Sequence, residues 1–152
     1  MFRGISAMNL DEKGRFAIPS RYRELLREQW SSQLVLTIDT EETCLLIYPL
    51  SEWNLIQQKI ESLPTFNPIA RRIQRLLMGY ATDLAMDNHG RVLIPPLLRE
   101  YAKLLKGIVL VGQGKKFELW DEEHWNARRD HWLEAGLKGG LTLPPEMQSL
   151  SL

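Results

Sequence analysis

The 152-residue sequence has almost no cysteine, no excess of charge of either sign and no long apolar segment. Lysine plus arginine number 19, as do aspartate plus glutamate, so the total charge does not point to a nucleic-acid partner. A single cysteine excludes an internal disulfide. No run reaches the roughly 18 apolar residues of a membrane span, and no apolar secretory signal opens the sequence. We therefore expect a cytoplasmic protein that is not bound to a membrane.

The remaining composition is that of an ordinary soluble globular protein, with 44% hydrophobic and 25% charged residues. The length suits one compact domain or two very small ones. The lone Cys44 lies in an apolar run, which predicts a buried core residue and not a reactive thiol.

A short stretch that occurs twice is the most informative feature of the sequence. Asp11 opens Asp-Glu-Lys-Gly-Arg and Asp87 opens Asp-Asn-His-Gly-Arg, and an apolar run, a proline and another arginine follow each. A repeat in one register predicts two halves that fold alike. The matched pairs, all at one offset, are Asp11 with Asp87, Gly14 with Gly90, Arg15 with Arg91, Pro19 with Pro95 and Arg23 with Arg99.

Each copy is interpreted as a β-hairpin followed by a short helix. The aspartate can accept hydrogen bonds from backbone amides further on, and the glycine accepts a positive φ, which together favour a tight turn. The proline then ends the second strand and can begin a helix. Turn formation accounts for Asp and Gly but not for Arg15 and Arg91, which we interpret as cations presented outward.

Further strands and helices repeat in the same order in the two halves. Tyr48 with Trp53 in the first half matches Trp120 with Trp125 in the second, and we expect these aromatics in the core. A break at Pro64–Pro68 suggests repeats at 1–66 and 67–135, followed by a loosely ordered tail at 136–152. The expected strands are 34–39, 44–48, 108–112 and 116–120, and the expected helices are 19–29, 51–63 with Ser51 as N-cap, 69–79, 97–105 and one capped by Asp121.

The helix expected at 69–79 is amphipathic and carries arginines on its outer side. These arginines could bind phosphate, lie in solvent, or make ionic contacts to a neighbouring subunit. Its inward residues are expected to be Ile69, Ile73, Leu76 and Leu77, and its arginines are Arg71, Arg72 and Arg75.

The motif Asp-x-Lys-Gly-Arg-x-x-x-Pro-x-x-x-Arg, with a degenerate second copy, resembles the MraZ family of bacterial regulators. The likeness covers nearly the whole chain and includes the segments 1–4, 45–49, 71–77 and 117–120. It implies a mainly β fold with short helices (α+β), in which two AbrB-like swapped-hairpin repeats form one pseudo-twofold β-barrel unit. It also implies chains that assemble head to tail into ring-shaped homo-oligomers.

The same resemblance implies a sequence-specific DNA-binding transcriptional regulator. Its partner would be double-stranded DNA of its own promoter region, read as short direct repeats, and its role would be repression of its own division and cell-wall gene operon. It would be cytoplasmic and associated with the nucleoid. No cofactor, metal or small-molecule substrate is expected.

A cationic two-stranded ribbon suits this function because such a ribbon fits the major groove of B-DNA. Arg15 can make the bidentate contact to guanine O6 and N7, and Lys13 can reach guanine or a phosphate. His89 in place of Lys13, and Leu97 in place of Arg21, make the second copy the weaker cationic hairpin. The candidate backbone contacts are Arg3, Arg21, Arg23, Arg91 and Arg99, and His89 completes the set of candidate DNA-binding residues.

Two other classes compete with DNA binding. An enzyme could use Asp11 and Asp87 as a carboxylate pair with His89, His124 or His131 as base, but turn formation already explains both aspartates and no metal or phosphate motif is present. The second is a protein-binding module of antitoxin type on the same fold. Known antitoxins of that kind resemble one hairpin unit with a long disordered tail, whereas this chain has two units.

Overall fold

The structure is a computed structural model and describes residues 1–150. The chain divides into two compact units, Met1–Glu122 and Glu123–Leu152. The last two residues of the predicted tail at 136–152 lie outside the described part of the chain.

The strands are β1 (Phe2–Asn9), β2 (Arg15–Ala17), β3 (Gln33–Ile38), β4 (Leu45–Pro49), β5 (Thr82–Ala85), β6 (Arg91–Leu93), β7 (Gly107–Gly114) and β8 (Phe117–Asp121). The helices are α1 (Ser20–Trp30), α2 (Leu50–Glu61), α3 (Pro68–Ile73), the π-helix η1 (Gln74–Met78), α4 (Pro96–Tyr101), α5 (Glu122–Ala135) and the 3-10 helix η2 (Pro145–Met147).

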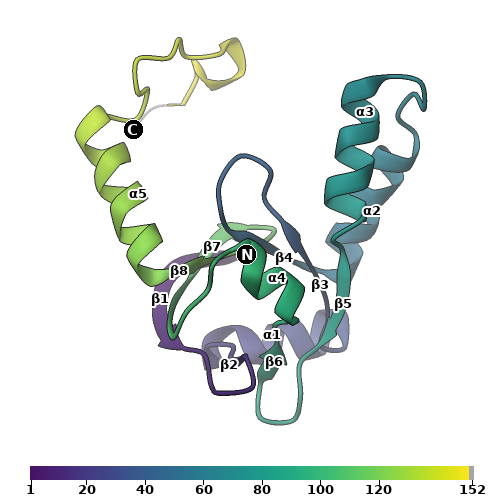
Figure 1. Cartoon of the computed structure of the whole chain (residues 1–152), viewed down its shortest axis with the longest axis vertical. Coiled ribbons are helices and arrows are strands. Elements are labelled where there is room, and N and C mark those ends of the chain that lie inside the picture. Colours follow the sequence, from purple (N-terminus) through teal and green to yellow (C-terminus); the bar gives the residue numbers. More distant parts are fainter. Residues whose placement is uncertain (151–152) are drawn as a thin grey trace. The chain divides into compact units, whose positions relative to one another are not determined.

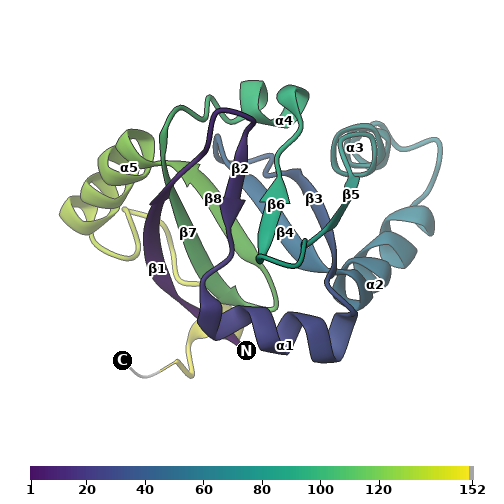
Figure 2. The same cartoon turned by 90° about the horizontal axis from the view of Figure 1, so that it is seen from below.

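Two sheets form the first unit, and all their pairings are antiparallel. The larger sheet has six strands in the order β1-β7-β8-β4-β3-β5, and the smaller is a ribbon of β2 and β6. Figure 1 shows the ribbon with the turn that precedes each of its strands, and Figure 2 shows the ribbon lying across the larger sheet. The fold is therefore α+β, as expected, while closure of the strands into one barrel stays a prediction.

The hairpins expected from sequence are wrong in their pairing, although both turns are present. β1 pairs along its whole length with β7 of the second half, and β5 of the second half pairs with β3 of the first. β2 likewise pairs with β6. Strands from the two halves are thus exchanged: β3 with β4 and β7 with β8 pair within one half, while the other pairings join the two halves.

The space between the sheets is filled by one large apolar core. Phe2 on β1 stacks on Phe117 of β8 with ring centroids 4.2 Å apart, and Tyr22 of α1 meets Phe117 edge-on. Ile18 and Ile94, which follow β2 and β6, are fully buried. The core therefore joins both halves, and burying the two apolar faces together offsets the small core that either half could form alone.

Several expected elements are confirmed with shifted ends. Residues 97–105 are not all helical: α4 ends at Tyr101, and Lys103 has a φ of 53°. Ser51 is not the N-cap of α2, since Pro49 holds that place and the Ser51 hydroxyl accepts a hydrogen bond from Trp30. The prediction that Cys44 is buried is confirmed.

The helix expected at 69–79 begins one residue earlier and changes to π-helix after Ile73. Its inward face was predicted partly wrongly, because Ile69 is 65% exposed and Leu76 40%. Ile73 and Leu77 do pack inward, against a small core centred on Trp53. The wider turn of the π-helix rotates Leu76 away from the face expected from a 3.6-residue period, whereas Ile69 lies before that change, in the first turn of α3.

None of the described helices is both long and apolar enough to cross a membrane.

The strand exchange predicts that neither half folds alone as a monomer. A fragment of residues 1–66 should lack native secondary structure by circular dichroism, because β1 and β2 have lost their partners β7 and β6. Mixing it with a fragment of residues 67–152 should restore the native spectrum. A folded monomeric 1–66 fragment, by size exclusion, would contradict the exchange.

Candidate nucleic-acid interface

The first turn, between β1 and β2, is built around the carboxylate of Asp11. Its Oδ1 accepts hydrogen bonds from the backbone N–H of Lys13 at 2.9 Å and of Arg15 at 2.8 Å. Its Oδ2 pairs with Nε of Arg15 at 2.8 Å. Gly14 has a φ of 84°, a conformation that L side chains rarely adopt. One aspartate thus fixes both the turn and the orientation of its arginine.

The second turn, between β5 and β6, repeats this geometry. Asp87 accepts from the N–H of His89 and of Arg91, both at 2.8 Å, and its Oδ2 pairs with Nε of Arg91 at 3.0 Å. Gly90 has a φ of 75°. The recurrence of Arg15 and Arg91, which turn chemistry had left unexplained, therefore has a structural cause as well, because each arginine closes its own turn.

The ion pairs leave one side of each guanidinium available. Arg15 and Arg91 bond to the aspartates through Nε, and among the described residues their two terminal nitrogens make no hydrogen bond. Their side chains are 29% and 37% exposed. The pair of terminal N–H groups can therefore still make a bidentate contact with an outside acceptor.

The register of the ribbon places the two arginines on one face. Arg15 lies opposite Leu93 and Arg91 lies opposite Ala17, while Phe16 and Val92, which alternate with them, are buried. Directly opposed residues share a face of a sheet, so Arg15, Ala17, Arg91 and Leu93 form the outer face of the ribbon. Sequence reasoning missed Ala17 and Leu93, although the alternation around Phe16 and Val92 was a signal for them.

Arg3 and Arg21 come close to each other at Tyr22. Arg3 is exposed on β1, and its carbonyl accepts the Tyr22 hydroxyl hydrogen bond. Arg21 is exposed at the start of α1, donates to Ser6 Oγ at 2.7 Å and stacks over the Tyr22 ring. Leu97, which matches Arg21 in the second half, is 61% exposed, so the cation is replaced there by an apolar side chain.

Arg23 and Arg99 have partners inside the protein. Nε of Arg23 donates to the carbonyl of Ile18 at 2.6 Å, and Nε of Arg99 donates to the carbonyl of Ile94 at 2.9 Å. Both side chains are half-buried. Their recurrence in the two halves therefore does not by itself indicate contact with phosphate.

The two turns differ in how they are supported. Arg27 of α1 donates to the carbonyl of Asn88 in the second turn at 3.3 Å. The residue at the matching place for the first turn is Lys103, which lies beyond the end of α4. Next to the first turn there is instead a cavity of about 430 Å³, lined by Leu10, Asp11, Glu12, Gly14, Arg99, Leu104, Leu105 and Lys106. Reasoning from the sequence missed Arg27, because its partner is the backbone carbonyl of Asn88 and no side chain marks the contact.

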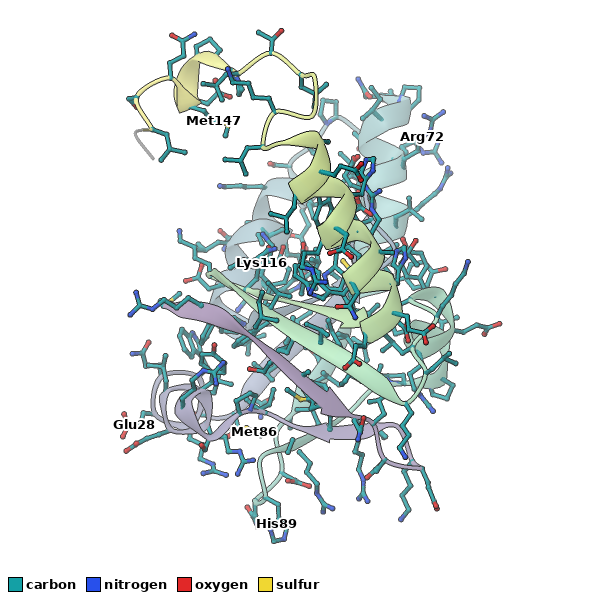
Figure 3. All side chains as sticks on the ribbon, turned by 90° about the vertical axis from the view of Figure 1, so that its left-hand side faces the viewer. Glu28, Arg72, Met86, His89, Lys116 and Met147 are labelled. Atoms are coloured by element: carbon teal, nitrogen blue, oxygen red, sulfur yellow. The ribbon has the colours of Figure 1, made fainter. Side chains whose placement is uncertain are left out.

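The arginines of α3 and η1 are not part of this surface. In Figure 3, Arg72 and the turn residue His89 lie at opposite ends of the first unit and point away from each other. Arg71, Arg72 and Arg75 are all exposed. These three arginines therefore face solvent or a further molecule, and they do not contribute to the surface formed by the turns.

The hydrogen bonds of the turns also set their acid–base behaviour. The backbone N–H of Arg15, more than the guanidinium of the same residue, holds the pKa of Asp11 below its ordinary value. The backbone N–H of Arg91 acts in the same way on the pKa of Asp87. Both carboxylates are therefore charged near neutral pH, and the charge of each arginine is partly balanced within its turn.

The exchanged strands and the two equivalent turns define an internally duplicated α+β protein with a paired-arginine ribbon. A family model described as "MraZ protein, putative antitoxin-like" matches the chain twice, over residues 1–76 and 77–138. A protein named "Transcriptional regulator MraZ" from Coxiella burnetii (strain Dugway 5J108-111) is 55% identical over 152 residues and 100% of both chains. Those of Legionella pneumophila (strain Corby) and Halorhodospira halophila (strain DSM 244 / SL1) are 54% identical over 154 residues and 51% over 152, again over 100% of both chains.

The chain belongs to the MraZ family of transcriptional regulators. The resemblance predicted from the repeated motif is thereby confirmed, as is the prediction that the protein is not an enzyme. The two matches of the family model agree with the duplication inferred from the repeated motif.

The lowered pKa of Asp11 predicts how the first turn responds to acid. A carboxyl group with a depressed folded pKa stabilises the native turn above its unfolded pKa, and that stability is lost as pH falls through the folded value. The amide proton signals of Lys13 and Arg15 should therefore titrate together in NMR spectra, with a midpoint below the ordinary range of aspartate. The variant Asp11→Asn should abolish this transition, and a midpoint at or above that range would contradict the bonding described.

Proposed function

We propose that the protein is a sequence-specific repressor that binds double-stranded DNA upstream of its own gene, within an operon for division and cell-wall synthesis. The observation that supports it best is the outer face of the β2–β6 ribbon, where Arg15 and Arg91 each keep their terminal nitrogens available. Membership of a family of transcriptional regulators supports it further.

The physical basis is a guanidinium oriented before the DNA arrives. Because Asp11 holds Nε of Arg15, the side chain loses less rotamer entropy on binding than a solvated arginine would. The remaining edge presents two N–H groups, which match guanine O6 and N7 in the major groove. Arg15 would thus carry sequence preference, and Asp11 would act as its positioning partner.

The surrounding residues would supply affinity and a second kind of readout. Lys13 and His89 are exposed in the turns, and His89 points away from the sheets in Figure 3. They and the exposed Arg3 and Arg21 would contact phosphates. Between the two arginines, Ala17 and the 49% exposed Leu93 offer an apolar surface suited to thymine methyl groups.

One ribbon of this size would read only a few base pairs, so selectivity requires several ribbons on repeated sites. We propose that chains associate into ring-shaped homo-oligomers and that closure of the two sheets gives the barrel-like unit from which the turns project. Linked sites raise the effective concentration of each ribbon at its repeat without any new contact. The protein would act in the cytoplasm, at the nucleoid.

A second candidate is a protein-binding module of antitoxin type. The description of the matching family as antitoxin-like favours it. In that case the outer face of the ribbon would have no special importance, and replacing Arg15 would leave function intact.

The DNA hypothesis predicts that Arg15→Ala abolishes selective binding to the DNA immediately upstream of the gene, since it removes the oriented bidentate donor. Fluorescence anisotropy against a scrambled competitor measures this, with circular dichroism to verify folding. Arg91→Ala should be milder, because the second turn has His89 where the first has Lys13. Equal losses in the two variants would contradict this ranking.

Two matched variants serve as controls for that experiment. Arg15→Lys keeps the charge but lacks the bidentate edge, so it should bind scrambled DNA like the wild type while losing selectivity. Arg72→Ala removes an exposed cation that Figure 3 places at the opposite end of the first unit from His89, and it should bind normally. Unchanged selectivity in Arg15→Ala would instead favour the protein-binding alternative.

A separate prediction concerns salt. The logarithm of the wild-type binding constant should fall linearly with the logarithm of salt concentration, with a slope of about −0.9 for each phosphate neutralised. Lys13→Ala should make that slope shallower by about one phosphate. Isothermal titration calorimetry over a series of salt concentrations tests this, and a flat response would exclude binding through the DNA backbone.

A further inference from the structure

We infer that Arg99 positions the first turn and Arg23 the second, so that each turn depends on an arginine from the opposite half of the chain. This inference rests on the proposed DNA-binding function for its consequences but on contacts within the first unit for its geometry. It replaces phosphate contact as the role of these two residues.

The first step in the argument is the anchoring of the two guanidinium groups. Arg23 and Arg99 each donate from Nε to the carbonyl of the residue just before the proline that precedes their own helix, Ile18 and Ile94. These isoleucines are fully buried. Each arginine is therefore fixed to a rigid part of its own half.

The second step is what the anchored groups cover. A Cβ built on Gly14 would lie 2.7 Å from Cζ and Nε of Arg99, and one built on Gly90 would lie 2.2 Å from Nε of Arg23. Each guanidinium thus lies directly against the turn glycine of the other half. Glycine is required there for close approach as well as for its positive φ.

Backbone hydrogen bonds complete the same crossed arrangement. Ile94 N–H donates to the carbonyl of Gly14 at 2.9 Å, and Ile18 N–H donates to the carbonyl of Gly90 at 2.8 Å. Each turn glycine is consequently held on one side by a strand end and on the other by an arginine, both from the opposite half. We call this pair of contacts the crossed clamp.

The two turns of the crossed clamp differ in how much other support they have. The second turn has the additional bond from Arg27 to the carbonyl of Asn88, whereas the cavity of about 430 Å³ adjoins the first turn. The first turn therefore depends more strongly on its clamp. Because Arg15 lies in the first turn, loosening Arg99 should affect DNA recognition more than loosening Arg23.

The test compares Arg99→Lys with Arg23→Lys in the full chain, bound to the upstream DNA and to scrambled DNA. Lysine keeps the positive charge that a phosphate contact needs. It has no planar guanidinium, so it cannot both donate to the isoleucine carbonyl and cover the turn glycine with a flat group. We expect Arg99→Lys to lose about tenfold in affinity for the upstream DNA, comparable to a weakened bidentate base contact, with scrambled DNA binding and salt slope unchanged. Arg23→Lys should lose clearly less.

NMR separates a positioning role from a general loss of stability. In Arg99→Lys the amide signals of Lys13 and Arg15 should shift while those of His89 and Arg91 stay, and Arg23→Lys should give the reverse pattern. Shifts confined to the turn of the same half would overturn the inference. So would full retention of selective affinity in Arg99→Lys together with a shallower salt slope in Arg99→Ala, the pattern of a phosphate contact.

Two further results keep the outcomes distinguishable. If Arg99→Lys fails to fold, Arg99→Gln removes the guanidinium that lies against Gly14 without changing the turn residues themselves, and it should reproduce the shifts at Lys13 and Arg15. If the wild type binds upstream and scrambled DNA equally, the proposed function fails, while the crossed NMR pattern would still uphold the clamp. If the wild type is selective but each lysine variant shifts only the turn of its own half, the crossed clamp is rejected and the proposed function is not.

Discussion

Neither half of this chain can satisfy the backbone hydrogen bonds of all of its own strands, and the rest of the structure depends on that constraint. β1 pairs with β7 and β5 with β3, and among the strands of residues 1–150 the short β2 and β6 pair only with each other. Unpaired backbone groups in a buried setting are costly, so the two halves fold as one unit. The shared core around Phe2 and Phe117 and the crossed contacts at both turns follow from the same exchange.

A chain with zero net charge can still present cations at chosen places, because different nitrogens of each turn arginine bind the aspartate and face outward. One nitrogen of Arg15 neutralises Asp11 and shapes the turn, while the outer edge of the group stays exposed. Asp87 and Arg91 repeat this at the other end of the ribbon. Local geometry, and not total charge, decides where an anionic partner meets the surface.

Much of the local structure could be predicted from the sequence, since turn chemistry and hydrophobic patterns act over a few residues. The Asp-x-x-Gly turns, α1 and the burial of Cys44 are examples. Strand partners could not be predicted from the residues alone, because an alternating pattern states which face is buried and not which strand lies alongside. The contacts of Arg23 with Gly90 and of Arg99 with Gly14 were hidden for the same reason, because only the exchange brings an arginine of one half onto the turn glycine of the other.

The early end of α4 has a consequence for symmetry. Two identical subunits would present the same turn at both ends of the ribbon, and such a pair would lie equally well on a site in either orientation. Here one end has Lys13 beside a cavity, and the other has His89 beside an arginine-supported loop. Because both halves belong to one polypeptide, the two ends of the ribbon can differ in sequence, and the ribbon therefore has a direction. Under the proposed function, a directional ribbon would distinguish a site from its reverse complement, and a row of such sites would then be read in a single sense.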